Sequence, residues 1–354
     1  MTRLGDVCAI RYGKDHKKLS DGSVPTYGSG GIMRYVDTAI CEQPSVLIPR
    51  KGTLGNLFYT DEPFWTVDTL FWTDIDQTKI VPKYLYYQLK QKDLASYNVG
   101  TAVPSLTVEV LNEIDLDVPS IDKQRRIVEV LNSFDSKIAL NNQLNDYLEQ
   151  LVDGKFQELF GGLNFNATLS DVAEITMGQS PAGSSYNEEG AGIIFYQGRG
   201  EFGWRFPKRR LYTTEPKRLA CEGDVLMSVR APVGDLNVAF ENCCIGRGLA
   251  AIHSETPSFA LYLMRFLKPQ LEAYNGEGTV FGSINGKALK SLEVALPSHN
   301  EVMQFESFAA PIDALIRSNE NETRKLNNLR NYLLPKLMSG EIDVSKVDLT
   351  QLTN

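Results

Sequence analysis

Near its start the chain reads Leu4-Gly5-Asp6-Val7-Cys8-Ala9-Ile10-Arg11-Tyr12-Gly13, and the pattern returns as Leu169-Ser170-Asp171-Val172-Ala173-Glu174-Ile175-Thr176-Met177-Gly178. Both stretches follow Leu-x-Asp-Val-x-x-Ile-x-x-Gly. From Gly100 onward the two halves align without a gap, so that Pro119-Ser120 meets Pro297-Ser298 and Asp135 meets Asp313. A repeat of this length determines the fold more than any local signal does. The sequence therefore predicts two copies of one structural unit.

Each copy begins with a mixed α+β globule. Short β-type runs between turn residues occur at 45–48, 56–59 and 69–73 in the first copy and at 224–229, 236–240 and 248–252 in the second. A helical stretch follows at 82–97 or 257–274, and a last strand ends at Pro119 or Pro297. The expected fold class is α+β, with two related mixed α/β globules separated by a long antiparallel two-helix coiled coil in a pseudo-two-fold repeat.

A long helix follows each globule. Alternating steps of four and three residues from Ile127 to Leu159, and again from Phe305, fall mostly on apolar side chains, which indicates a coiled-coil seam. The expected seam comprises Leu131, Phe134, Ile138, Asn141, Asn145, Leu148, Val152, Ile312, Ile316, Asn319, Thr323, Leu326 and Leu333. Lys155 also falls on this walk. Pro311 is expected to interrupt the second helix, and Gly340 to end it.

The connectivity determines how the two helices run. The first helix ends near Phe160 and the second globule begins within about ten residues, so a second helix that packs on the first must run antiparallel. This places Asn141 and Asn145 opposite Thr323 and Asn319, a polar layer of the kind that fixes register. The predicted domain boundaries are 1–119 and 162–297 for the globules, 120–161 and 298–340 for the helices and 341–354 for a C-terminal tail.

The composition excludes several classes of protein. The chain has 354 residues, 42% hydrophobic and 23% charged, as in ordinary globular proteins, and has no apolar run long enough to span a bilayer. The five cysteines lack zinc-type spacing, so we predict no metal site and a reduced, cytoplasmic chain. Only three histidines are available for a catalytic set, and we predict no catalytic residues.

Positive charge is concentrated locally, although the net charge of −8 does not by itself indicate a nucleic-acid partner. The segment 199–218 holds seven Lys and Arg residues against two Glu residues, with aromatic residues among them, and 11–18 holds four against Asp15. Basic loops on an acidic body are typical of phosphate binding. Two related readers on a stiff spacer match a DNA duplex with two separated half-sites.

Two other functions fit parts of this pattern. A repeat with a coiled coil also suits a protein-binding scaffold, which would not select DNA. Asp15-His16-Lys17 downstream of Asp6 is similar to the Asp…Asp-x-Lys set of a metal-dependent DNA nuclease, which would cleave DNA with magnesium alone. The chain contains neither the Asn/Asp-Pro-Pro-aromatic run of an amino-methyltransferase nor a nucleotide-binding glycine fingerprint.

These features together resemble the specificity subunit of type I restriction–modification systems. The resemblance rests on the globule–helix–globule–helix order, the repeated opening, the globule ends at 101–106 and 278–284 and the exit Leu333-Leu334-Pro335-Lys336-Leu337-Met338-Ser339-Gly340. It implies two target-recognition domains, each reading half of an asymmetric bipartite DNA site. It also implies a coil that sets the spacer and docks two modification subunits, which bind S-adenosylmethionine and methylate adenine, together with a restriction subunit. The chain itself would bind no cofactor and catalyse no reaction.

Candidate DNA contacts follow from side-chain chemistry, because lysine and arginine bind phosphates while arginine, asparagine and glutamine read base edges. The phosphate candidates are Lys14, Lys17, Lys18, Arg50, Lys51, Lys208, Arg209 and Lys287. The candidates for base or shape readout are His16, Tyr27, Arg34, Tyr35, Gln179, Tyr186, Arg199, Arg205 and Arg230.

Overall fold

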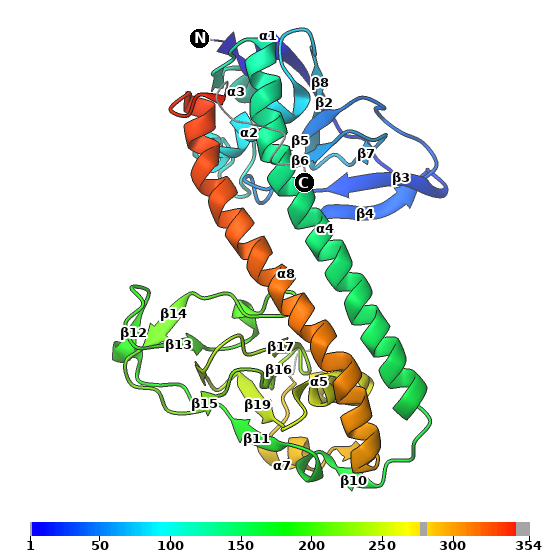
Figure 1. Ribbon diagram of the computed structural model, residues 1–354. Coiled ribbons are helices and arrows are strands. Elements are labelled where there is room, and N and C mark those ends of the chain that lie inside the picture. Colours follow the sequence, from blue (N-terminus) through cyan, green and yellow to red (C-terminus); the bar gives the residue numbers. More distant parts are fainter. Residues whose placement is uncertain (1, 277–281, 345–354) are drawn as a thin grey trace. The chain divides into compact units, whose positions relative to one another are not determined.

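The computed structural model describes residues 2–276 and 282–344 and divides into two compact units (Figure 1). The first unit joins Met1–Leu140 to Glu322–Asn354, and the second is Asn141–Asn321. Each unit holds one globule and a segment of each long helix. Residues 278–281 of the predicted globule end at 278–284, and residues 345–354 of the predicted C-terminal tail, lie outside the described residues.

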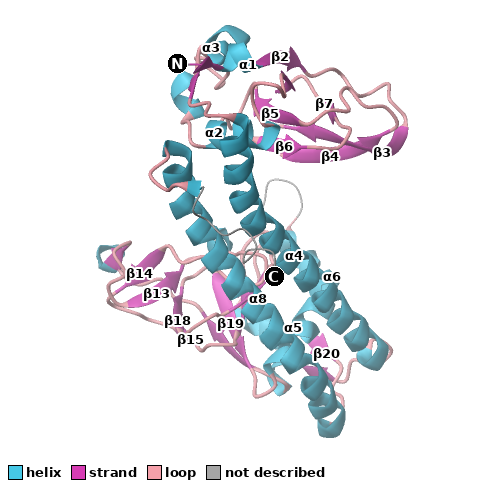
Figure 2. Ribbon diagram, turned by 45° about the horizontal axis from the view of Figure 1, so that its top comes forward, coloured by secondary structure: helices cyan, strands magenta, loops and turns pink. Residues whose placement is uncertain are grey.

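The first globule contains two sheets and a two-stranded closure. The closure pairs β1 (Thr2–Arg3) with β9 (Asp115–Leu116). The antiparallel four-stranded sheet has the order β2 (Cys8–Tyr12), β8 (Leu70–Ile75), β5 (Ser45–Pro49) and β6 (Phe58–Thr60). The second sheet has the order β4 (Gly31–Val36), β3 (Asp21–Gly28) and β7 (Trp65–Thr66), with β3 and β7 parallel. The helices are α1 (Leu4–Val7), α2 (Pro82–Lys90) and α3 (Val108–Asn112). In both ribbon views the β3–β4 hairpin projects away from α2 (Figures 1 and 2).

The second globule repeats this plan. Its closure pairs β10 (Ala167–Thr168) with β20 (Glu293–Val294). Its four-stranded sheet has the order β11 (Glu174–Met177), β19 (Leu249–His253), β16 (Val225–Ser228) and β17 (Leu236–Val238). Its second sheet has five strands: β12 (Tyr186–Asn187), β14 (Leu211–Thr213), β13 (Ile193–Tyr196), β18 (Cys243–Ile245) and β15 (Leu219–Ala220). The helices are α5 (Pro257–Phe266), α6 (Lys268–Glu272) and α7 (Gly286–Lys290).

The two globules share topology as well as sequence. The four-stranded sheets have the same order, and the parallel pair β3–β7 corresponds to the parallel pair β13–β18. Both α2 and α5 begin with a proline, whose fixed φ suits the first turn of a helix. The second sheet differs, with three strands in one copy and five in the other. The predicted internal repeat and α+β class are confirmed, and the copies diverge mainly in this sheet.

The repeated opening motif has the same structural role in both copies. Leu4 and Leu169 have no exposed surface. Asp6 Oδ2 accepts the Arg3 N–H at 2.8 Å, and Asp171 Oδ2 accepts the Thr168 N–H at the same distance. The aspartates thus satisfy free amides at the start of a short helical turn, as capping carboxylates do.

The glycine that ends the motif is required by close backbone packing. A Cβ on Gly13 would lie 2.0 Å from the carbonyl oxygen of Val67, and one on Gly178 would lie 2.1 Å from that of Gly246. The Gly13 and Gly178 amides donate to equivalent residues of the next strand, Leu70 and Leu249. Only glycine permits this approach, and it directs the following loop across the end of the parallel strand pair.

The long helices are α4 (Ile121–Phe160) and α8 (His299–Ser339), and in the first unit their segments pack antiparallel. Arg330 Nη1 lies 2.7 Å from Asp135 Oδ1, and Lys137 Nζ lies 3.5 Å from Glu322 Oε2. Along these ion pairs the residue numbers rise on α4 and fall on α8, so the two helix segments run antiparallel. Residues of the predicted exit motif pack into the core of the first globule: Leu333, Leu334, Leu337 and Met338.

The segments in the second unit are also antiparallel. Asn319 Nδ2 donates to Asn145 Oδ1 at 2.8 Å inside the helix pair, and the rings of Phe156 and Phe305 meet edge to face. Seven predicted seam side chains are buried, namely Leu131, Phe134, Asn141, Asn145, Val152, Ile316 and Asn319. Six are half-buried, namely Ile138, Leu148, Ile312, Thr323, Leu326 and Leu333.

Two details of the helices differ from expectation. Beyond Val152 the buried side chains are Phe156 and Phe160 rather than Lys155 and Leu159, because the buried face there follows the core of the second globule. Pro311 does not interrupt α8, which continues through it. An interior proline costs a helix about 3 kcal/mol. Here the buried side chains of Phe305 and Ala309 before it and Ile316 after it hold the helix together.

No helix among residues 2–276 and 282–344 combines the length and apolarity needed to cross a membrane.

Candidate nucleic-acid interface

In the second globule, arginine and amide side chains converge on a hollow of about 250 Å³ beside the loop that follows Gly178. Its walls come from four separate segments of the chain. They are Ser180, Gln197, Gly198, Arg199, Ser228, Arg230, Ala231, Arg247 and Gly248. The hollow therefore gathers three arginines, a glutamine and two serines.

Backbone hydrogen bonds hold these segments together. The Gly248 amide donates to the Gln197 carbonyl at 3.3 Å, and the Arg247 amide donates to Ser180 Oγ at 3.2 Å. Arg230 forms an isolated antiparallel bridge with Ser283. A Cβ on Gly248 would lie 2.9 Å from the Gln197 oxygen, so glycine lets the two loops meet. The side chains at the rim are therefore positioned by a rigid backbone.

The arginines of this hollow differ in how they are paired. Arg199 Nε lies 2.7 Å from Asp235 Oδ2. Arg230 and Arg247 are exposed, and neither forms an ion pair with any described residue. Their guanidinium groups are thus available to a bound anion or a base edge, which is the chemistry that arginine supplies to guanine and phosphate.

The first globule has a hollow at the equivalent place, beside the loop that follows Gly13 and the end of β3. It measures about 760 Å³ and is lined by Asp15, His16, Lys17, Gly28, Ser29, Gly30, Met33, Val67, Asp68 and Thr69. His16 Nδ1 is buried and has no hydrogen-bond partner among the described residues. Two contacts fix the base of this loop: Trp65 Nε1 donates to the Lys14 carbonyl, and the Lys14 amide donates to the Thr66 carbonyl.

The remaining candidates of the first globule are exposed or bind neighbouring residues. Arg34 Nη2 lies 2.5 Å from Asp21 Oδ1, whereas Tyr35 is exposed on the same strand. Tyr27 is half-buried against Phe58. Three exposed lysines complete the set: Lys14, Lys18 and Lys51. Arg50 Nη1 donates to the Asp68 carbonyl, a residue of the hollow.

Candidates of the second globule lie at several places. Gln179 is exposed next to Ser180, and Tyr186 is half-buried, with its hydroxyl donating to the Pro181 carbonyl. Arg209 Nε lies 2.6 Å from Glu241 Oε1 at the surface, and the neighbouring Lys208 is exposed. Lys287 belongs to a separate hollow of about 740 Å³ that also contains Arg218 and Lys290.

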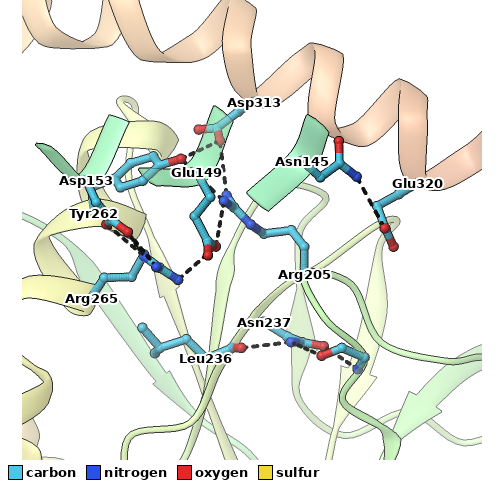
Figure 3. Close-up of polar contacts among 11 residues, drawn as sticks. Asn145, Glu149, Asp153, Arg205, Leu236, Asn237, Tyr262, Arg265, Asp313 and Glu320 are labelled. Atoms are coloured by element: carbon cyan, nitrogen blue, oxygen red, sulfur yellow. Dashed lines mark hydrogen bonds and ion pairs between the residues drawn. The ribbon is translucent and has the colours of Figure 1, made fainter. Parts of the chain in front are cut away.

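Arg205, predicted to read bases, is instead buried within the second unit (Figure 3). Its side chain is 4% exposed, with Nη2 3.0 Å from Glu149 Oε1 on α4 and Nη1 3.0 Å from Asp313 Oδ1 on α8. Nη2 also donates to the Tyr262 hydroxyl at 3.3 Å. Burial alone would lower the pKa of Arg205, but Tyr262, Asp313 and Glu149 outweigh it and raise this pKa. The prediction for Arg205 is wrong, because this guanidinium joins the globule to both helices.

The structure adds residues that the sequence did not single out. Gln197, Arg247 and Met33 line the two hollows, and Arg218 and Lys290 accompany Lys287. Arg247 stands between two glycines, a signal for a loop that approaches other backbone closely. Gln197 and Met33 have no flanking residues in the sequence that would predict a place in a binding hollow.

The carboxylates of the nuclease alternative are engaged locally. Asp6 caps α1, and Asp15 Oδ1 accepts the Lys17 amide at 3.0 Å. That hydrogen bond lowers the pKa of Asp15. Two copies of one fold, each with a hollow lined by polar and charged side chains at the same place, define instead a tandem recognition protein.

Comparison with known proteins identifies the family. The family described as type I restriction modification DNA specificity domain matches residues 1–150 and 166–331. The chain belongs to this family and carries its domain twice. The resemblance expected from the sequence is thus confirmed, whereas nothing in the comparisons supports the nuclease alternative.

Two relatives come from Methanocaldococcus jannaschii. The putative type I restriction enzyme MjaX specificity subunit is 34% identical over 298 residues, which cover 76% of this chain and 70% of the relative. The type I restriction enzyme MjaIX specificity subunit is 23% identical over 348 residues, covering 86% and 78%. The crystal structure of a type I restriction–modification S subunit from M. genitalium has a TM-score of 0.65 at 16% identity and covers 95% of each chain, which shows the common fold.

Proposed function

We propose that the chain is the non-catalytic specificity subunit of a type I restriction–modification complex, acting in the cytoplasm, and that each globule reads one half of an asymmetric bipartite DNA site. The observation that carries this proposal is the pair of hollows at equivalent positions with different linings. The first presents His16, Lys17 and Met33. The second presents Gln197, Arg230 and Arg247. One scaffold with two different sets of side chains suits two different half-sites.

The lining of the second hollow supports direct readout of bases. Arginine donates to the two acceptors of guanine in the major groove, whereas a glutamine amide donates to N7 of adenine and accepts from its N6 amino group. Arg230 and Arg247 would contribute the first chemistry and Gln197 the second. Lys208, Lys287 and Lys290 would bind phosphates, which position the protein without selecting a sequence. The antiparallel helices would set the unspecified spacer between half-sites.

An apolar stripe on α4 supports the docking of partner subunits. Leu144, Tyr147 and Leu151 occupy one face at helical spacing, and 39%, 59% and 53% of their surfaces are exposed. Exposed apolar stripes on a soluble protein often mark protein interfaces. We assign this face to modification subunits, two per chain by the pseudo-symmetry, which would bind S-adenosylmethionine and methylate adenine. A restriction subunit would complete the assembly.

The readout is tested by the pattern of methylated adenines in cells that express the complex. Arg230→Ala and Arg247→Ala should relax one or two base positions in a single half-site and leave the other half-site unchanged. Loss of a bidentate arginine contact costs about 1–3 kcal/mol. Arg209→Ala is the matched control, since this exposed arginine is paired with Glu241 and, as a phosphate candidate, should relax no base position. Equal weakening at both half-sites would contradict the assignment.

A globule exchange separates this proposal from a protein-binding scaffold. Replacing residues 1–119 with the corresponding part of a family member that has a different target should alter one half-site only. A scaffold would leave the DNA preference of the assembly unchanged. Leu144→Glu with Leu151→Glu should abolish co-purification of the modification subunit while the chain remains folded.

A further inference from the structure

Three metal-ligating side chains meet at one corner of the second globule, outside both hollows. Cys221 and Asp224 belong to the turn between β15 and β16, and His253 is the last residue of β19. The Cys221 Sγ, an Asp224 carboxylate oxygen and a His253 ring nitrogen lie within 4.8 Å of one another. Within the described part of the chain, no other group of three or more such side chains is as close.

The turn that carries two of these side chains is fixed by hydrogen bonds from its backbone amides to the side chains of Asp224 and Asn242. The Cys221 amide donates to Asp224 Oδ2 at 2.8 Å, and the Glu222 amide donates to Asn242 Oδ1 at 2.9 Å. Gly223 has a φ of +88°, a conformation that favours glycine. These bonds leave Asp224 Oδ1 free to face His253. Cys221 Sγ has no hydrogen-bond partner among the described residues and is exposed to solvent.

The sheet brings the third side chain to the same face. In the β16–β19 pair, Val225 stands opposite Ile252, which places Asp224 opposite His253. His253 Nδ1 lies 2.6 Å from Asp224 Oδ1. On its other side His253 pairs in register with Glu174 of β11, so a second carboxylate flanks the imidazole. A cation at this corner would therefore have negative charge around it.

We propose that Cys221, Asp224 and His253 form a Zn²⁺ site, which differs from the expectation of no metal site because the fold, and not the cysteine spacing, brings the three side chains together. Zinc binds thiolate, imidazole and carboxylate ligands, whereas Mg²⁺ and Ca²⁺ are bound by oxygen ligands. The ligand atoms lie roughly 2.0–2.3 Å from zinc, so two of them are about 3.2–3.8 Å apart. The three atoms now lie within 4.8 Å of one another, and the exposed Cys221 and His253 side chains have room to rotate toward that spacing. The metal replaces the Asp224–His253 hydrogen bond, and a fourth position stays open to water.

The site would stiffen the attachment of the globule to α8. Glu222, within the ligand turn, places Oε1 2.9 Å from Arg317 Nη2 on α8. The same nitrogen donates to the Phe240 carbonyl at 2.9 Å, and the guanidinium stacks on the Phe240 ring. A metal that fixes the turn thus fixes the residue that binds Arg317. The inference does not depend on which DNA sequence is read.

Cobalt(II) titration of the purified full-length chain tests the proposal, because a thiolate ligand gives a sulfur-to-cobalt charge-transfer band and zinc displaces cobalt. We expect one cobalt per chain, with this band, and release by one equivalent of zinc. Cys221→Ser should remove the band, and His253→Gln should weaken cobalt binding at least tenfold. The matched control is Cys41→Ser, since Cys41 is a half-buried free cysteine of the first globule.

Circular dichroism and urea unfolding verify that each variant is folded. Absence of a charge-transfer band in the wild type at excess cobalt would overturn the proposal. So would a band that survives Cys221→Ser or disappears in Cys41→Ser. Failure of the DNA readout experiments would leave the metal titration unaffected, so the two outcomes are distinguishable.

Discussion

Replacing Arg205 with methionine should lower the free energy of unfolding of the second unit by about 3 kcal/mol. The substitution keeps an unbranched apolar stem but removes the guanidinium and its two ion pairs of 3.0 Å from a site that is 4% exposed. Removing one partner of a buried pair costs about 3–5 kcal/mol. We expect a loss at the lower end of this range because both carboxylates retain a partner. Glu149 still pairs with Arg265 Nη1 at 2.9 Å, and Asp313 still accepts the hydrogen bond of the Tyr262 hydroxyl at 3.0 Å.

The chain allows this loss to be measured in the second unit alone. Trp204 is its only tryptophan, so fluorescence during urea unfolding in a Trp65→Phe, Trp72→Phe background reports that unit. A loss of about 3 kcal/mol corresponds to a fall in Tm of roughly 6–12 °C for a unit of this size. Arg209→Met is the matched control, because its exposed ion pair should contribute about 0–1 kcal/mol.

A second substitution tests the cause. Asp313→Asn, added to Arg205→Met, should recover part of the lost stability, since it removes the charge of a carboxylate that is left with the Tyr262 hydroxyl but without its ion pair to Arg205. The reasoning is refuted if Arg205→Met is as stable as Arg209→Met. If it then also loses selectivity at one half-site, Arg205 reads DNA after all.

Three further expectations concern the repeat and the helix pair. Gly13→Ala should destabilise the first unit by about 1–3 kcal/mol in urea unfolding, because its Cβ would lie 2.0 Å from a backbone oxygen; an unchanged midpoint would contradict the packing argument. Asn145→Leu alone should destabilise, since it leaves the Asn319 amide unpaired, whereas leucine at both positions should raise Tm above wild type; a stabilising single variant would be inconsistent with the buried pair. The Thr168 amide lowers the pKa of Asp171, so its stabilisation exists above the unfolded pKa of about 3.9 and is lost as pH falls through the folded value. The Tm difference between wild type and Asp171→Asn should therefore shrink below about pH 4. A Tm difference that grows at low pH would contradict a lowered pKa of Asp171 in the folded state.

The repeated framework could be predicted from sequence because its physical demands are local. Leu4 and Leu169 fill cores, Asp6 and Asp171 cap turns, and Gly13 permits a close backbone approach. Each demand restricts the residue type at a fixed spacing, so it leaves a readable motif in both copies. The heptad pattern is readable for the same reason.

The site could be predicted only in part. Arg205 and Arg209 look alike in sequence, and only the acids on α4 and α8 distinguish the buried residue from the exposed one. The five-stranded second sheet is built from strands of two to four residues, which are too short for a period to emerge. The predicted interruption of the helix at Pro311 was wrong because tertiary packing outweighs the local cost of a proline inside a helix.

Each globule has its first and last strands side by side, with Thr2 opposite Leu116 and Ala167 opposite Val294. Because the two ends of each globule are paired with each other, the whole segment between them can be replaced by another segment whose ends are paired in the same way. Exchange of this segment between members of the family would thus deliver a whole globule with its closure intact and leave the long helices unchanged.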